Sequence, residues 1–362
     1  MRVWAAKLNG QKSTMGSADI TIYGAGAFGL SAALEAQTRG AKVRVIDPNG
    51  VGFGSSGGVV GALAPHTPER WDSVKEFQLE SLLLSRDYWP NVERLSGQST
   101  GYGNLGRLQA IPNEHQLGLA HERTCAAQTL WKGLAEWRVI PVADAAGWAP
   151  QTPTGWLVHD TLSARINPAR ACAALAAAVI ASGGEIVSQA PAEGKVIHAT
   201  GVWGLNEMTA RLGYEVGNGV KGQAVLLKYD LPQAPQIFTG GVHVIPHSDG
   251  TLAIGSTSER YFDAPQQTDA MADDLLARAI TAMPQLADAL VLQRWAGVRP
   301  RAATRAPMMG ADPDRKGEFV FNGGFKIGFG IVPLAAQRLI DLVLENRDTI
   351  PDAFKVEASL QS

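Results

Sequence analysis

The segment from Asp19 to Asp47 constrains the fold of this chain more than any other feature. A short apolar run, 20–23, leads into the glycine turn 24–29, a helical pattern reaches about residue 39, and a second apolar run, 43–46, ends at Asp47. A strand, a GxGxxG turn, a helix and a strand that ends in an acidic residue together form a dinucleotide-binding unit. The segment therefore predicts a βαβ unit with a dinucleotide site.

The glycines of this turn have separate physical roles. Gly24 allows the tight turn, Gly26 lets a pyrophosphate approach the backbone, and Gly29 lets the helix pack closely on the strand. The helix dipole and its first N–H groups favour an anion at this point. Asp47 lies 18 residues after Gly29, where a carboxylate accepts hydrogen bonds from ribose hydroxyls. We assign to the cofactor site Gly24, Gly26, Ala27, Phe28, Gly29 and Asp47.

Composition narrows the class of protein. The 362 residues suffice for two domains, and 45% hydrophobic with 18% charged residues is ordinary for a globular chain. The net charge of -2 argues against a broad nucleic-acid surface. Cys125 and Cys172 lack metal-ligand spacing, which suits a reducing cytoplasm, and we expect no metal site and no membrane span. Residues 1–17 lack the apolar core of a signal peptide, so we expect a flexible extension there.

The order of expected elements indicates two domains. Both ends of the chain alternate strands and helices, whereas the middle is rich in strands, with Asp249-Gly250 as a hairpin signal. We expect helices near 71–95, 168–182, 269–282 and 332–346, with Asn167-Pro168 opening the second. The fold class is α/β (α+β overall), a Rossmann-like domain with an inserted antiparallel-sheet domain. We place the first domain at 18–95, 160–205 and 296–346, and the second, substrate-binding domain at 96–159 and 206–295.

Two further glycine-rich segments bear on the cofactor. The first, 52–61, contains Ser55, Ser56, Gly57 and Gly58, and the second, 323–330, contains Gly324 and Gly328. The first is also compatible with a flexible loop. Three separated segments whose backbone approaches one ligand require a long cofactor that spans both domains, which favours FAD over NAD.

These segments, in their order along the chain, resemble the D-amino-acid oxidase family of flavoproteins, above all glycine oxidases and sarcosine-oxidase-like members. The matching pieces are the 24–29 turn with Asp47, 55–58, 196–203 with Thr200 and Gly201, 220–223, 295–300 and 323–330. The resemblance implies FAD and oxidation of a C–N bond of a primary or secondary amino acid. No cysteine lies in the C-terminal flavin segment and no histidine lies at 55–59, so we expect FAD to be held non-covalently.

The segment 297–310 carries a second resemblance. It is similar to the flavin domain of the bifunctional enzyme that matures carboxymethylaminomethyl-uridine in tRNA. That domain belongs to the same superfamily and also cleaves a glycine-like group from an amine. A tRNA-modifying flavoenzyme is therefore the alternative function, although the charge balance disfavours nucleic acid as a partner. A flavin-bearing protein without enzymatic activity is a third possibility.

The first resemblance implies roles for three side chains, Arg299, His243 and Lys326. The arginine of the GxRP motif, Arg299, would hold the substrate carboxylate, since a guanidinium is planar, charged and bidentate; a structural salt bridge is its alternative. His243 stands where glycine oxidases carry a tyrosine, and would hydrogen-bond the substrate or help deprotonate its amine. Lys326 would lie near the substrate carboxylate or the flavin; an exposed lysine without a site role is its alternative. His66 is a weaker candidate for the flavin face.

The same resemblance implies the partners. The substrate is a small-molecule amine or amino acid, and the electron acceptor is O2 or another carrier. The sequence leaves the substrate side chain, its stereochemistry and the oligomeric state, including a homo-oligomer, open.

Overall fold

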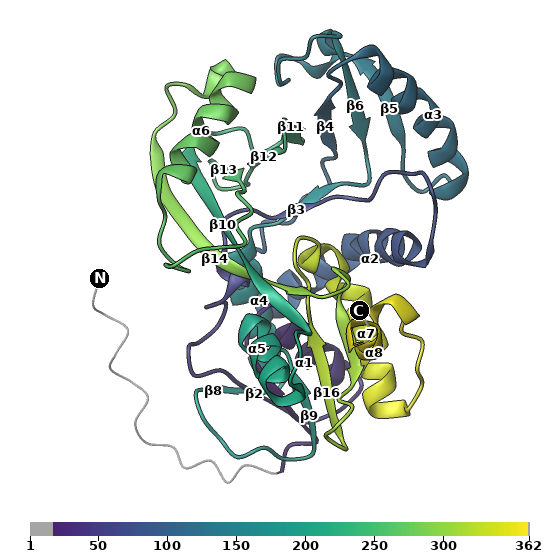
Figure 1. Ribbon diagram of the computed structural model, residues 1–362, viewed down its shortest axis with the longest axis vertical. Helices are drawn as coiled ribbons and strands as arrows, with labels where there is room; N and C mark the ends of the chain where they lie inside the picture. The colour runs from purple at the N-terminus through teal and green to yellow at the C-terminus, as the bar shows by residue number, and fades with distance from the viewer. Residues whose placement is uncertain (1–16, 361–362) are drawn as a thin grey trace.

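The computed structural model describes residues 17–360, which form two lobes (Figure 1). The extension predicted at 1–17 therefore lies outside the described residues, apart from Ser17. One lobe contains a six-stranded sheet and the other an eight-stranded sheet. The two long strands β10 (Gly217–Lys228) and β14 (Val291–Ala302) run from one lobe into the other. Within residues 17–360, no helix is long and apolar enough to cross a membrane.

The six-stranded sheet is the nucleotide-binding type that the sequence predicts. Its order is β15-β16-β9-β1-β2-β8, and all neighbours are parallel except β15 and β16. β1 lies between β9 and β2, so the chain order reverses beside it, at the switch point where such sheets bind their ligands. The strands are β1 (Ile20–Tyr23), β2 (Val43–Ile46), β8 (Glu185–Val187), β9 (Lys195–His198), β15 (Met308–Ala311) and β16 (Glu318–Asn322).

Four helices form one layer of this lobe. α1 packs on α4 and α7, and α2 packs on the same two helices. Their buried alanines, leucines and isoleucines form one core with the strands beneath. The side chain of Asn167 accepts a hydrogen bond from the Arg170 N–H and caps α4, as its sequence predicts. The helices are α1 (Ala27–Thr38), α2 (Ser73–Ser96), α4 (Pro168–Ala181) and α7 (Gly328–Glu345); α5 (Gly201–Leu212) packs instead on β10, β14 and β16.

The eight-stranded sheet of the other lobe has the order β14-β10-β13-β12-β11-β4-β6-β5. Every pair in it is antiparallel except β4 with β11. α6 (Ala270–Ala282) packs on β10, β12 and β13 over a second apolar core. The fold class is thus confirmed, and the domain bounds stay a prediction. The remaining strands of this sheet are β4 (Arg107–Ala110), β5 (Trp137–Pro141), β6 (Trp156–Asp160), β11 (Gln236–Thr239), β12 (Val242–Pro246) and β13 (Thr251–Gly255).

Smaller elements complete the described chain. β3 (Ala62–Leu63) pairs with β7 (Ala164–Arg165), and α3 (Glu114–Leu130) packs on β5. The short helix α8 (Val356–Leu360) packs on β15. Single 3₁₀ turns lie at Ser55–Gly57, Val142–Ala145, Pro284–Leu286 and Asp352–Phe354.

The structure departs from the sequence expectations at α5, which was not predicted, and at α3, α7 and β10. α3 was not predicted, because Ala120 and Ala127 are the only fully buried residues along it and no apolar stripe marks the helix. α7 begins at Gly328, before the predicted residue 332, because glycine is a poor helix former and Pro333 suggested a later start. β10 begins at Gly217, in a stretch whose glycines hide the strand pattern in the sequence.

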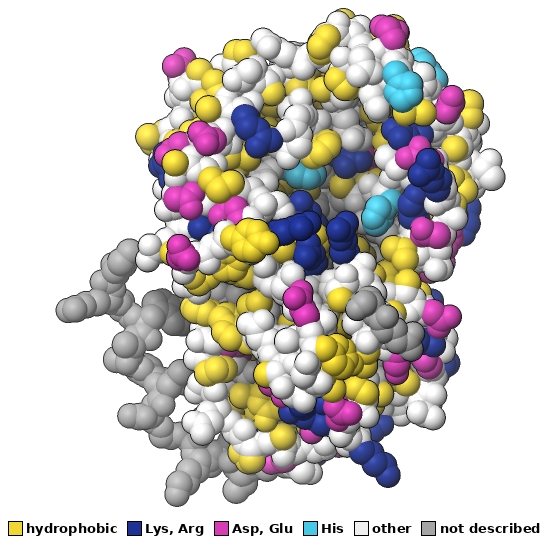
Figure 2. All heavy atoms as spheres, viewed as in Figure 1, with side chains coloured by type: hydrophobic (Ala, Val, Ile, Leu, Met, Phe, Trp, Pro, Cys, Tyr) yellow, Lys and Arg dark blue, Asp and Glu magenta, His cyan; other side chains and the backbone are white. Residues whose placement is uncertain are grey.

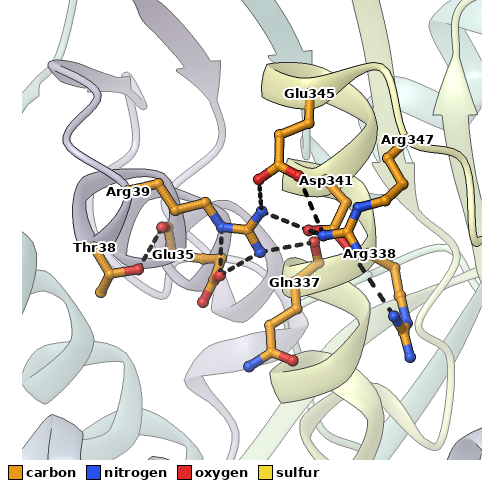
Figure 3. Close-up of polar contacts among 8 residues, drawn as sticks. All are labelled: Glu35, Thr38, Arg39, Gln337, Arg338, Asp341, Glu345 and Arg347. Carbon is orange, nitrogen blue, oxygen red and sulfur yellow. Dashed lines mark hydrogen bonds and ion pairs between the residues drawn. The ribbon is translucent and has the colours of Figure 1, made fainter.

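An ion-pair network joins α1 to α7 (Figure 3). Asp341 on α7 is 3% exposed, and its Oδ1 accepts from Arg39 at 2.5 Å and from Arg347 at 2.8 Å. Arg39 also donates to Glu35 at 2.8 Å on its own helix and to Glu345 at 3.0 Å across the interface. The first and the last long helices are therefore fastened to each other by a buried carboxylate.

We expect Asp341→Ala to lower the free energy of unfolding by about 2 kcal/mol, because a buried carboxylate that compensates two guanidinium groups is lost. The effect should stay near this value since Glu35 and Glu345 still neutralise Arg39. Urea denaturation measures it. The control is Arg338→Ala, because Arg338 is 3.9 Å from Asp341 and its removal should change stability by less than about 0.5 kcal/mol. Equal stability of both variants would show that the network is not structural.

Candidate active site

A cavity of about 1670 Å³ lies between the two sheets. It exceeds the range of about 300–1,000 Å³ that is common for a single small-molecule site. One part of its wall consists of the loops that follow β1, β2 and β9, and another consists of β10, β12 and β14. Figure 2 shows that Lys and Arg side chains gather in the hollow between the lobes. The size and the composite wall fit a long cofactor together with a substrate.

The glycine turn after β1 forms one end of this cavity, which Gly24, Gly26, Ala27 and Phe28 line. Gly24 has a φ of 105°, and a Cβ there would lie 2.3 Å from the Ala199 carbonyl oxygen. Gly29 is outside the lining, and a Cβ at Gly29 would lie 1.9 Å from the Gly24 carbonyl oxygen. Glycine is therefore required at both positions by close backbone packing.

Two polar side chains fix the shape of the turn. Asp47 lines the cavity, and its Oδ2 accepts from the Ala25 N–H at 2.8 Å while its Oδ1 accepts from the Asn49 N–H at 2.9 Å. A carboxylate oxygen has a further acceptor position, so Asp47 can still accept from a ligand hydroxyl. Ser56 Oγ accepts from the Ala27 N–H at 3.1 Å. The sequence did not indicate that these side chains also hold the turn.

The other glycine segments meet at the same cavity. Ser55, Ser56 and Gly58 line it, whereas Gly57 lies behind them, where a Cβ would be 2.2 Å from the Gly52 carbonyl oxygen. Thr200 and Gly201 at the end of β9, and Gly324 and Gly328 before and at the start of α7, complete this part of the wall. All predicted cofactor residues except Gly29 and Gly57 therefore line one cavity.

Small residues on adjacent strands form a flat surface opposite these loops. In the sheet register His243 pairs with Gly255, Gly255 with Ala224, and Ala224 with Trp295, so these residues share one face. Along β10 and β14 the next pair on that face is Gly222 with Gly297. We call Gly222, Ala224, Gly255 and Gly297 the small-residue platform. The sequence did not show that these residues adjoin one another, because their proximity depends on the register of the three strands β10, β13 and β14.

Arg299 extends across this platform. A Cβ at Gly222 would lie 1.8 Å from Arg299 Nη2, so glycine is needed beneath the guanidinium. Nη2 donates to Ser256 Oγ at 2.5 Å, and both Nη atoms donate to the Thr257 carbonyl. No carboxylate of residues 17–360 forms an ion pair with it, so the salt-bridge alternative finds no partner there. Arg301 and Arg305 do not line the cavity.

The buried carboxylate of Glu259 lies near Arg299 and partly offsets the desolvation of its guanidinium, but the two groups form no ion pair. Burial lowers the pKa of Arg299 to about 10, and the nearby Glu259 carboxylate acts in the opposite direction. Glu259 is held by hydrogen bonds from Thr257 Oγ1 and Gln223 Nε2 and by Lys221 Nζ at 3.5 Å. The guanidinium is therefore charged at neutral pH, and part of its donor fork remains available to an anion.

His243 lies on β12 beside the guanidinium and is electrically neutral. Burial and the charges of Arg107, Lys326 and Arg299 lower its pKa to about 3. Its ring packs against Phe238 at 4.7 Å between centroids, and its Nδ1 has no hydrogen-bond partner within residues 17–360. A histidine with so low a pKa is a poor proton acceptor at neutral pH. Hydrogen bonding to a substrate suits it better than deprotonation does.

Lys326 projects from the loop before α7, and its ammonium lies 5.6 Å from the Phe325 ring centroid. Partial burial and the charge of Arg299 lower its pKa. The structure thus brings all three predicted substrate residues, Arg299, His243 and Lys326, to one cavity. His66 also lines it, although its side chain is largely exposed.

Sequence reasoning missed several residues of the wall. Arg107 is 6% exposed and donates to the buried Asp160 at 2.9 Å, and Trp295 lies over Gly297 and against Gly58. Ser256 holds Arg299, as described above. Of these residues only Trp295 could have been found, because it lies in the 295–300 segment that resembles the family; the resemblance gave it no role of its own.

Comparison with known proteins agrees with this geometry. Residues 19–342 match the family model DAO, described as FAD dependent oxidoreductase. The chain belongs to this family. The match covers both lobes, from the start of β1 to within α7. It therefore identifies the protein as an FAD-dependent oxidoreductase.

Individual relatives are amino-acid oxidases by name. The glycine oxidase of Pseudomonas aeruginosa is 26% identical over 92% of this chain and 96% of its own length. Among solved structures, a glycine oxidase from Bacillus cereus has a TM-score of 0.78 at 20% identity, covering 91% of this chain and 96% of its own. Iminodiacetate oxidase from Chelativorans sp. BNC1 has a TM-score of 0.79 at 20% identity, covering 93% and 98%. These relatives favour amine oxidation over the tRNA alternative.

The residues present fit FAD. The cavity is large enough for a dinucleotide, and the first turn of α1 meets it at a glycine N-cap that carries no side chain. The Asp47 carboxylate at the end of β2 and the backbone of 324–328 line the same space. Neither cysteine lines the cavity.

We expect Gly24→Ala to abolish FAD retention, because the added Cβ meets the Ala199 carbonyl and the φ of 105° is strained for alanine. The ratio of absorbance at the flavin band to protein absorbance measures it. The matched control is Gly183→Ala, whose φ is 86° but whose Cβ meets nothing within 4 Å. A fully yellow Gly24→Ala protein would contradict the role of the turn.

A second prediction concerns the pH dependence of stability. The pKa of His243 is about 3 in the folded protein, below the unfolded value of about 6.5. Between these values the unfolded chain binds a proton that the folded chain does not, so stability falls as pH falls. His243→Gln should flatten this dependence by up to about 1.4 kcal/mol per pH unit. Urea denaturation at pH 4.5–6.5 tests it, with pH 7.5–8.5 as the range in which the slopes should agree.

Proposed function

We propose that this protein oxidises the C–N bond of a small amino acid or an N-substituted glycine. The observation that carries the proposal is the guanidinium of Arg299, which lies on the small-residue platform with no acidic partner among residues 17–360. It faces the same cavity as the cofactor turn. The similar protein from Pseudomonas aeruginosa is named glycine oxidase, and oxidation of glycine is a reaction of the class proposed here.

The substrate is oriented by the chain's own residues. Arg299 holds its carboxylate through the charge of the guanidinium and the N–H donors that Ser256 and Thr257 leave free. The neutral imidazole of His243, which lines the cavity, exchanges a hydrogen bond with the amine. A deprotonated amine is required before the adjacent C–H can leave, and the low pKa of His243 indicates that solvent removes this proton.

FAD supplies the two-electron acceptor for the hydride that leaves the substrate carbon. Water then hydrolyses the resulting imine. The residues that would hold FAD are those of the turn 24–29, Asp47, Ser55, Ser56, Gly57, Gly58, Thr200, Gly201, Gly324 and Gly328. We propose that it is bound non-covalently, and that O2 or another carrier reoxidises it.

We expect Arg299→Ala to raise KM for glycine or sarcosine by about 100-fold, because two charge-assisted hydrogen bonds to the carboxylate are lost. Steady-state kinetics and anaerobic bleaching of the flavin measure this. The matched control is Arg301→Ala, which removes an arginine two residues away that does not line the cavity. An unchanged KM in Arg299→Ala would show that another group binds the carboxylate.

A further inference from the structure

The cations that line the cavity outnumber the acidic groups available to neutralise them. Arg107 pairs with Asp160 at 2.9 Å and Arg294 with Asp273 at 2.6 Å. Arg260, Arg299 and Lys326 have no ion pair with any described residue of 17–360. The acidic residues of the lining are Asp47, which holds the cofactor turn, and Asp263.

Arg299 and Lys326 reach the same place from two walls. The Phe325 N–H donates to the Pro300 carbonyl at 3.0 Å, which fixes the loop of Lys326 beside the strand of Arg299. The Arg299 guanidinium contacts Ser256, which follows Gly255, and Gly255 pairs with His243. Both positive charges also act on His243, whose pKa they lower together with burial. Two cations therefore lie close to one neutral imidazole.

This arrangement is electrostatically incomplete with a substrate that has one carboxylate. Partial burial lowers the pKa of Lys326, and the positive charge of Arg299 acts in the same direction. A single carboxylate on Arg299 leaves Lys326, which is exposed toward solvent, without a counter-charge among residues 17–360. A ligand with two anionic groups neutralises both cations, and such complementarity governs specificity.

We propose that the preferred substrate is a dianionic amine, in which the carboxylate next to the reacting carbon binds Arg299 and a second anionic group on the other substituent of the nitrogen or carbon binds Lys326. This inference rests on the proposed function. It narrows the substrate class from small amino acids in general to acidic ones. The second group is a carboxylate or a phosphonate-type anion, because an ammonium binds either.

The first experiment compares substrates that differ by one charge. Sarcosine, iminodiacetate and N-(phosphonomethyl)glycine share an N-substituted glycine and differ only in a methyl, carboxymethyl or phosphonomethyl substituent. Anaerobic flavin bleaching should give a kcat/KM at least 10-fold higher for one of the two dianions than for sarcosine. The two arms identify the second anion. Bleaching by sarcosine or glycine without any such preference overturns the inference but leaves the proposed function standing.

The second experiment measures binding without turnover. Malonate and acetate differ by one carboxylate, and their Kd values are read from the flavin absorbance change and from thermal shift. Malonate should bind at least 10-fold more tightly than acetate, and in Lys326→Met this ratio should fall to about 2 or less. Lys316→Met, which removes an exposed lysine outside the cavity, should leave the ratio unchanged.

The remaining outcomes separate the alternatives. If Lys326→Met changes FAD content while the malonate-to-acetate ratio stays the same, Lys326 serves the cofactor and the inference is wrong. If the unmodified protein binds malonate and acetate with about equal Kd values, the inference is also wrong. If no amine bleaches the flavin, the proposed function itself fails, and malonate binding alone then shows whether the site prefers dianions.

Discussion

The close contact between the glycine turn and the end of β9 is the constraint on which the cofactor lobe depends. Gly24 lies against the Ala199 carbonyl and Gly29 against Gly24 itself, at separations that leave no space for a side chain. These contacts set α1 directly on β1 and β9. The direction of the α1 N-terminus, the place of Ser56 beneath it and the hydrogen bond from Ala25 to Asp47 all follow from that packing.

The cofactor side of the site could be predicted from the sequence because its chemistry is local. The turn, the acidic residue after β2 and the serine-glycine loop are each defined within a few consecutive residues, and spacing alone carries their meaning. The substrate side could be predicted only in part. Arg299 stood out through its motif, but the platform beneath it comes from three strands at 222, 255 and 297, and only their register brings them together.

The difference between features defined by consecutive residues and features that depend on packing also explains which elements the sequence did not predict. α3 is covered on one side only and carries no apolar stripe, so periodicity had nothing to detect. The first turn of α7 uses glycines, which indicate a loop when neighbouring residues alone are considered. The electrostatic state of His243 was also beyond the sequence, since it arises from burial and from three cations on separate elements, Arg107, Lys326 and Arg299.

The shared strands β10 and β14 have a consequence for motion. They are paired over most of their length, from the outer lobe to the cofactor lobe, by a ladder of backbone hydrogen bonds with one register shift between Leu226 and Leu227. Because both strands cross between the lobes side by side, movement of one lobe relative to the other has to bend or twist the two strands together. The paired strands therefore restrain a large separation of the lobes more than a single connecting segment would.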